Sequence, residues 1–291
     1  MCRLFGFRSV IPSQVHQSLL QADNALGLQS RQHPDGWGVA HYIDGTPHVI
    51  RSSMTAISDT LFHRVSGVVA SETVLAHVRK ATQGVKSVLN CHPFQYGRWI
   101  FAHNGDIPEF DQSREALRQR IDPHLRRFIL GDTDSEVIFH LFLSELSRHG
   151  PLGRVLGLEA VMDALSTTVE TVRSVVDTPQ ASKPALLTLM VTDGKTLVAH
   201  QGGKELFWST YKKSCPERDS CSYFAPECEA ESTSGFVNHL IFSSEPLSGD
   251  NIWIPLAQGE MIGVDARMRL LRRHRSPHTT SAHDPLQVLN A

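Results

Sequence analysis

The chain has 291 residues, of which 41% are hydrophobic and 20% charged, a composition typical of globular proteins. Its length suits one large domain or two small ones, with a core that needs no disulfide bonds. The net charge of -2 and the lack of aromatic residues interleaved with basic ones argue against nucleic-acid binding. No apolar run suits a signal peptide or a membrane span of roughly 20 residues, so we expect a cytoplasmic protein.

Five cysteines are present, and a reducing cytoplasm would keep them as thiols. Cys215, Cys221 and Cys228 cluster in a segment rich in serine, proline and glutamate. Their spacing contains no CxxC pair and no clear fourth ligand, which argues against a zinc site. We therefore predict solvent-exposed loop thiols there, and no metal or other cofactor.

The first half of the chain predicts one helix and three strands. Apolar residues recur at helical spacing over 15–28, with Ser13 as a candidate N-cap. A Pro-Asp-Gly turn then leads into a strand over 36–42. Residues 74–78 and 99–102 are apolar enough for buried strands, and each runs directly into polar residues.

Three helices follow, predicted over 114–128, 133–146 and 156–175. The second opens with Thr133 as N-cap and Glu136 three residues later, which is the pattern of a capping box.

Strands return after these helices. Residues 185–192 and 196–200 flank an Asp-Gly turn as a hairpin, and further strands are expected at 240–242 and within 259–272. Strands, then helices, then strands indicate an α+β layered protein rather than a βαβ repeat. We predict one domain over 2–275 and a flexible tail over 276–291.

Four short polar segments lie at predicted strand ends or helix starts: residues 77–84, 90–94, 103–106 and 133–136. Considered singly, each has an ordinary structural explanation. His77 and His103 suit core histidines, and the Asn-Gly pair at 104–105 suits a hairpin turn. Asp134 suits a helix cap, and an isolated Arg79 suits a surface or ion-pair position.

Together with Cys2, these segments resemble the class II glutamine amidotransferases, which are N-terminal nucleophile hydrolases. Six motifs of that family occur in the family's order: Met-Cys at 1–2, Asp-Gly-x-Gly at 35–38, His-x-Arg-x-Ala-Thr-x-Gly at 77–84, Asn-x-His-Pro at 90–93, His-Asn-Gly at 103–105 and Asp-Ser-Glu at 134–136. The resemblance implies a four-layer αββα sandwich of two packed, mainly antiparallel sheets. It is strongest to a stand-alone branch similar to the γ-glutamyl hydrolases of ergothioneine synthesis and of fungal glutathione degradation.

Cys2 is the candidate nucleophile. Removal of Met1 would leave it with a free α-amine, whose pKa of about 7.7–8.0 suits proton transfer near neutral pH. That amine can act as the base for its own thiol. The resemblance implies that the Asn104 side chain and the Gly105 backbone N–H face the oxyanion.

The resemblance also implies a substrate pocket. Arg79 would hold the α-carboxylate of a γ-glutamyl substrate in a bidentate pair, and Asp134 would hold its α-ammonium group. Thr82 and Gln83 would line the same pocket.

Gly36 and Gly38 would let the backbone pass close to the nucleophile. The sequence departs from the family pattern at Lys80, where many members carry Trp or Tyr, and at Gln83, where sugar-aminating members carry His. A Cys91–His92 dyad is disfavoured, because adjacent side chains in an extended segment point to opposite faces.

We expect hydrolysis of the γ-glutamyl amide bond of glutamine or of a γ-glutamyl peptide or thiol conjugate, through a Cys2 γ-glutamyl thioester. One alternative is a glutaminase subunit that supplies ammonia to a separate synthetase partner. Another is a non-catalytic binder of γ-glutamyl metabolites. The leaving group and the oligomeric state are not encoded in a readable pattern.

Overall fold

The structure is a computed structural model that describes residues 2–274. Over these residues the strands form two sheets, and every strand pairing within them is antiparallel. The seven-stranded sheet has the order β11 (Ile254–Pro255), β9 (Phe207–Ser209), β10 (His239–Ser243), β1 (Arg3–Gln14), β4 (Ala70–Val78), β2 (Trp37–Ile43) and β3 (Thr46–Ser52). The six-stranded sheet has the order β13 (Leu270–Arg273), β12 (Met261–Val264), β8 (Leu197–His200), β7 (Leu186–Thr192), β6 (Trp99–Asp106) and β5 (Phe94–Tyr96).

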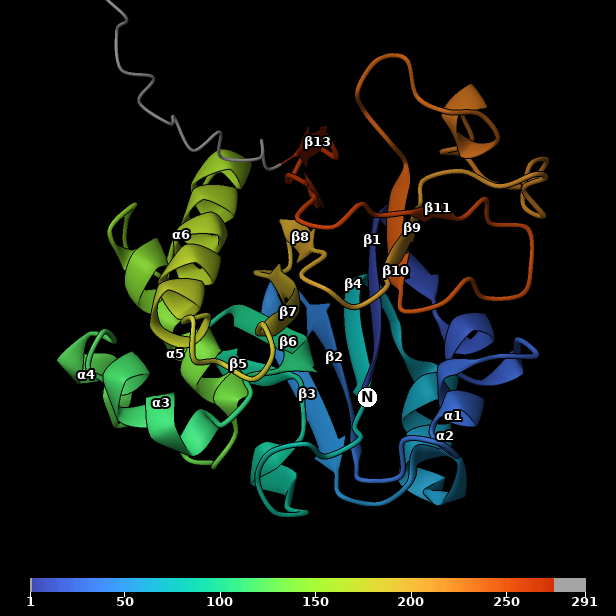
Figure 1. Cartoon of the computed structure of the whole chain (residues 1–291). Coiled ribbons are helices and arrows are strands. Elements are labelled where there is room, and N and C mark those ends of the chain that lie inside the picture. The colour runs from blue at the N-terminus through green and yellow to red at the C-terminus, as the bar shows by residue number, and fades with distance from the viewer. Residues whose placement is uncertain (1, 275–291) are drawn as a thin grey trace, which may run out of the picture.

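Helices cover the outer face of each sheet. Those beside the six-stranded sheet are α3 (Phe110–Arg118), α4 (Pro123–Arg126), α5 (Asp134–Ser147) and α6 (Leu158–Val176). Those beside the seven-stranded sheet are the π-helix η1 (Gln17–Gln21), α1 (Leu26–Gln29) and α2 (Thr60–Val68). Figure 1 shows this succession of helices, sheet, sheet and helices across the molecule. The predicted α+β sandwich of four αββα layers is confirmed.

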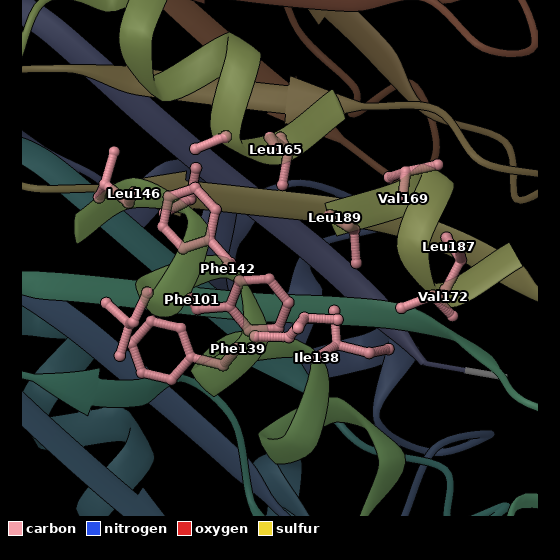
Figure 2. Packing of buried hydrophobic residues seen from close by; sticks show 14 of the residues in the cluster. Phe101, Ile138, Phe139, Phe142, Leu146, Leu165, Val169, Val172, Leu187 and Leu189 are labelled. Atoms are coloured by element: carbon pink, nitrogen blue, oxygen red, sulfur yellow. The ribbon is translucent and has the colours of Figure 1, made fainter. Parts of the chain in front are cut away.

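Strand alternation divides the buried apolar side chains into three layers. On β6, Phe101 packs with the helices, whereas Ala102 lies between the sheets. Figure 2 shows the helix layer, where Phe101 stacks on Phe139 of α5 with ring centroids 5.2 Å apart. On β1, Leu4 lies between the sheets and Phe5 packs toward α1 and α2. Each sheet is thus covered on both faces.

Two predicted helices are interrupted. The helix expected over 15–28 is split into η1 and α1, because Asn24 leaves the helical path to bind the Pro246 carbonyl at 2.7 Å and the Ser248 N–H at 2.9 Å. The candidate cap Ser13 lies inside β1. The helix expected over 114–128 breaks before Pro123, which disfavours helical backbone at the residue preceding it.

The pattern reading also missed several elements. β1, β3, β5, β9, β11 and α2 were not predicted, and Pro12 within β1 weakens its strand signal. The other predicted strands, the hairpin around Asp193 and the helices α5 and α6 are present. The predictions for Met1 and for the tail over 276–291 lie outside the described residues.

The start of α5 matches its predicted cap in part. Thr133 Oγ1 accepts a hydrogen bond from the Glu136 N–H at 3.3 Å, as expected of an N-cap. The Glu136 carboxylate does not close the box on Thr133. It accepts instead from the N–H groups of Leu130 at 3.0 Å and Gly131 at 2.6 Å. This helix start is therefore tied to the preceding loop as well as to its own cap.

We expect Thr133→Ala to lower the free energy of unfolding by about 1 kcal/mol, because it removes the cap acceptor. Denaturant unfolding of the purified protein measures the change. Thr167→Ala, at an exposed position within α6, is the matched control and should alter stability by less than about 0.5 kcal/mol. An equal effect of the two changes would contradict the capping role.

Candidate active site

Cys2 lies at the start of the central strand. In the β1–β4 pair Arg3 is opposite Val78, so Cys2 faces the residues that follow β4. Its sulfur lies 3.4 Å from the Lys80 backbone nitrogen and 3.5 Å from the Lys80 carbonyl oxygen. Burial raises the pKa of the Cys2 thiol above its ordinary value, although the Lys80 backbone contact and the Arg79 charge act in the opposite direction. The thiol therefore needs a base to become a nucleophile.

The chain that follows Cys2 is held by the segment after β10. The Leu4 N–H donates to Ser244 Oγ at 2.9 Å, and the Ser244 N–H donates to the Leu4 carbonyl at 3.0 Å. Arg3 pairs with Glu245 at 3.8 Å. These contacts fix the backbone directly after the candidate nucleophile.

Arg79 is a buried cation, only 2% exposed. Its guanidinium donates to the carbonyl oxygens of Gln83 at 2.7 Å, and of Gly84 and Val85 at 3.4 Å each. Within the described part of the chain no carboxylate lies within 4 Å of it. A buried charge is ordinarily paired, so this side chain suits an anionic ligand.

Asp134 and Gln83 meet at the chain segment after β6. One Asp134 oxygen accepts from the Ile107 N–H at 2.8 Å, and the other accepts from the Ser135 N–H at 2.7 Å. The Gln83 amide donates to Asp106 at 3.1 Å and to the Ile107 carbonyl at 3.4 Å. The Asp134 charge acts on the Cys2 thiol and raises its pKa. A negative and a positive group thus lie on the same side of the molecule as the thiol.

Asn104 and Gly105 lie on β6. Asn104 is 2% exposed, and its buried side-chain oxygen has no hydrogen-bond partner among the described residues. A Cβ at Gly105 would collide with the Leu186 carbonyl and the His103 ring, so only glycine fits there. His103 itself is satisfied, by Ser135 Oγ at 2.9 Å and the Leu186 carbonyl at 2.8 Å.

Gly36 and Gly38 are needed for a reason other than the predicted one. A Cβ at Gly36, whose φ is +128°, would meet the Cys91 sulfur, and one at Gly38 would meet the His92 carbonyl. Neither position approaches Cys2 closely enough for Cys2 to be among its nearest contacts. The link to the site is indirect, because the Gly36 carbonyl accepts from the Arg79 N–H at 2.8 Å.

The buried histidines do not serve as a base for Cys2. His77 and His92 stack with ring centroids 4.2 Å apart. Burial lowers the pKa of His77 to about 3 and that of His92 well below its ordinary value, so both rings are poor proton acceptors near pH 7. The Cys91 thiol donates to backbone carbonyls and not to His92, whose ring nitrogens have no partner in the described chain. The two form no thiol–imidazole dyad.

His33 was missed by the pattern reading, although it directly precedes the Pro-Asp-Gly turn. It is 4% exposed, and burial, with the charges of Arg3 and Lys80, lowers its pKa to about 4. The charges that act on it place His33 near the N-terminal end of β1. Thr82 is exposed, and none of the hydrogen bonds among residues 2–274 involves its side chain. No contact between these residues supports its predicted place in the pocket.

Three further observations concern the chain as a whole. None of the helices between residues 2 and 274 is long and apolar enough to cross a membrane. The same residues hold no group of three or more His, Cys, Asp or Glu side chains suited to a metal ion. Cys228 is only 9% exposed, so the prediction of solvent-exposed thiols is wrong for this residue, whereas Cys215 and Cys221 are partly exposed.

Comparison with known proteins supports the assignment suggested by the motifs. Residues 1–284 match the family model of class II glutamine amidotransferases. The chain is 32% identical over 229 residues to the probable glutamine amidotransferase DUG3 of Saccharomyces cerevisiae, covering 68% of this chain and 62% of that protein. It is 35% identical over 119 residues to the γ-glutamyl-hercynylcysteine sulfoxide hydrolase of Mycobacterium tuberculosis, covering 37% of this chain and 50% of that protein.

The fold has solved counterparts as well. The structure of a class II glutamine aminotransferase domain protein from Silicibacter pomeroyi superposes with a TM-score of 0.61 at 23% identity, covering 95% of this chain and all of that one. The family match extends over almost the whole chain and agrees with the sandwich observed. The chain belongs to the class II glutamine amidotransferases.

Proposed function

We propose that the protein hydrolyses the γ-glutamyl amide bond of a small γ-glutamyl conjugate, with Cys2 as nucleophile. The observation that carries the proposal is the buried Arg79 guanidinium beside the Cys2 thiol, without a carboxylate partner in residues 2–274. The α-carboxylate of a γ-glutamyl group would complete its charge balance. Asp134, which accepts from the Ile107 N–H, offers the opposite charge for the α-ammonium group.

The first step needs a deprotonated thiol. Removal of Met1 would expose the Cys2 α-amine, which takes the thiol proton as the sulfur attacks the γ-carbonyl carbon. The C–N bond of the amide then breaks, the amine leaving group receives that proton, and the γ-glutamyl thioester remains on Cys2. A water molecule, activated by the same amine, hydrolyses the thioester to glutamate and restores the thiol.

The tetrahedral oxyanion of both steps requires donors held in place beforehand. We assign this role to the Asn104 side-chain amide and the Gly105 N–H. Asn104 is buried, and none of the hydrogen bonds among residues 2–274 uses its side-chain N–H groups, so these donors remain available to an oxyanion. The tight packing of Gly105 against Leu186 holds the following backbone in one position.

One relative and one departure from the family pattern favour a conjugate over free glutamine as substrate. The name of the M. tuberculosis protein describes hydrolysis of γ-glutamyl-hercynylcysteine sulfoxide. Lys80, whose backbone contacts the Cys2 sulfur, departs from the aromatic residue of many amidotransferases. The chain spans 62% and 50% of the two relatives named above. Their substrates therefore do not fix the leaving group of this protein, and a panel of γ-glutamyl substrates tests it.

We expect purified protein to release glutamate from γ-glutamyl peptides such as glutathione faster than from glutamine. Cys2→Ala should lower this rate by about 10⁴-fold or more, because it removes the nucleophile. Cys91→Ala, which removes another buried thiol from the same region, is the control and should retain most of the activity. Cleavage of glutamine alone, and only with a second protein added, would instead favour the ammonia-supplying subunit.

The pH dependence tests the base. We expect kcat/KM to rise with pH through a pKa of about 7.7–8.0, since the α-amine must be deprotonated. His33→Gln should leave the apparent pKa of this rise in kcat/KM unchanged, because a pKa of about 4 makes the His33 ring neutral across the assay range. Intact-mass measurement should find a chain that begins at Cys2. A shift of this apparent pKa in His33→Gln would identify the base as the His33 imidazole and not the α-amine.

Arg79→Lys should raise KM for the γ-glutamyl substrate by about 10-fold to 100-fold with a smaller effect on kcat. A lysine cannot form the bidentate pair, and each lost charge-assisted hydrogen bond contributes about 1.5–3 kcal/mol. Initial-rate kinetics measure both constants. Arg64→Lys, on the exposed face of α2, is the matched control. An unchanged KM in Arg79→Lys would remove this residue from the binding site.

A further inference from the structure

A second concave site lies on the outer face of the seven-stranded sheet. It is a cavity of about 590 Å³, within the range of small-molecule sites. Phe5 and Phe7 of β1 and Ile241 of β10 line its floor, and Phe7 and Ile241 are direct cross-strand partners. One wall is formed by residues 9–18 and the other by residues 212–228. Figure 1 shows this second segment, in gold and orange, on the same side of the sheet as α1 and α2.

This cavity is separate from the candidate active site. None of Cys2, Arg79, Asn104 and Asp134 lines it. The reason is strand alternation: Leu4 of β1 lies between the two sheets, whereas Phe5 and Phe7 face outward. A ligand in the cavity would therefore contact the opposite face of the strand that begins after Cys2.

Three polar side chains on the cavity wall carry buried atoms without a partner. They are His239 Nε2, Asn251 Oδ1 and His16 Nδ1. Buried polar atoms in folded proteins are almost always hydrogen-bonded, because leaving one without a partner is destabilising. Three such atoms around one cavity indicate a polar occupant that supplies the missing partners.

The charge of the cavity selects the kind of occupant. Lys212 lines it, and no carboxylate lies within 4 Å of its ammonium group in the part of the chain described. His239 is close enough to feel that charge. Burial first, and Lys212 second, lower the pKa of His239 to about 4, so the ring is neutral near pH 7. Glu217 is the acidic residue on the wall, and it is exposed.

Three of the five cysteines in the chain, Cys215, Cys221 and Cys228, also line this wall. They are not among any side-chain group suited to a metal within residues 2–274. Cys228 is held by the Asn238 amide, whose nitrogen lies 3.1 Å from its sulfur. The rate at which these thiols are alkylated can therefore report whether the cavity is occupied.

We propose that the cavity binds a small organic anion with an aromatic or similarly flat apolar body, whose carboxylate pairs with Lys212 while an N–H or O–H group donates to Asn251. The apolar body would lie on Phe5, Phe7 and Ile241. This site does not depend on the proposed reaction, because none of its residues takes part in that chemistry.

Titration with indole-3-acetate, followed by calorimetry and by NMR of the full-length protein, tests the site. This probe has a flat body, a carboxylate and one N–H donor. Indole-3-acetamide is its neutral match and should bind at least about tenfold more weakly, since hydrogen bonds to charged groups are the stronger ones. Equal affinity for the two probes, or no saturable binding of either, would overturn the proposal.

Two variants and one chemical readout locate the binding. Lys212→Met should weaken indole-3-acetate binding by about tenfold or more, whereas Lys213→Met, at the exposed neighbouring residue, should change it by less than twofold. Saturating probe should slow alkylation of Cys228 in the unaltered protein, as measured by peptide mass spectrometry. Binding that survives Lys212→Met, or that leaves the rate of Cys228 alkylation unchanged, would place the probe elsewhere and refute the site.

Discussion

The antiparallel pairing of β1 with β4 is the contact on which the rest of the molecule depends. These two strands lie at the centre of the seven-stranded sheet, and their register puts Arg3 opposite Val78. That register brings the Cys2 sulfur to the Lys80 backbone and sets Arg79 beside it. A slip of one residue would turn Leu4 away from the space between the sheets and expose Phe5 to it. The burial of both side chains therefore fixes the position of the thiol.

Two charged side chains near the thiol, Arg79 and Asp134, form no ion pair with another side chain among residues 2–274. Carbonyl oxygens accept from the Nη1 and Nη2 groups of Arg79 without cancelling its charge. Asp134 is held in the same manner, by hydrogen bonds from the backbone N–H groups of Ile107 and Ser135. Each charged group is thus held by the fold, but neither has an oppositely charged side chain as a partner between residues 2 and 274. A zwitterionic γ-glutamyl end is the kind of ligand that such an arrangement stabilises, because it supplies both opposite charges together.

The sequence predicted what is local and missed what depends on distant contacts. Thr133 and Pro123 act on their own helices, yet Pro123 was overlooked as a break. Asn24 ends a helix because it bonds to Pro246 and Ser248. The residues around Asn24 in the sequence give no sign of these distant contacts. The αββα layering came from the resemblance of the motifs and not from the order of elements. Gly36 and Gly38 were singled out correctly as places without room for a side chain, but their neighbours are Cys91 and His92.

The cavity is another feature that depends on contacts between residues far apart in the sequence. Its walls come from residues 9–18 and from residues 212–251, and each segment alone has an unremarkable polar composition. They meet because β10 pairs with β1, which sets His239 opposite Ser9 and Ile241 opposite Phe7. The same two strands continue to Ser244 and Leu4, which bind each other beside Cys2. One strand pair therefore supports the thiol at its end and forms the cavity floor along its outer face, so the two sites share a rigid element while their side chains remain on opposite faces.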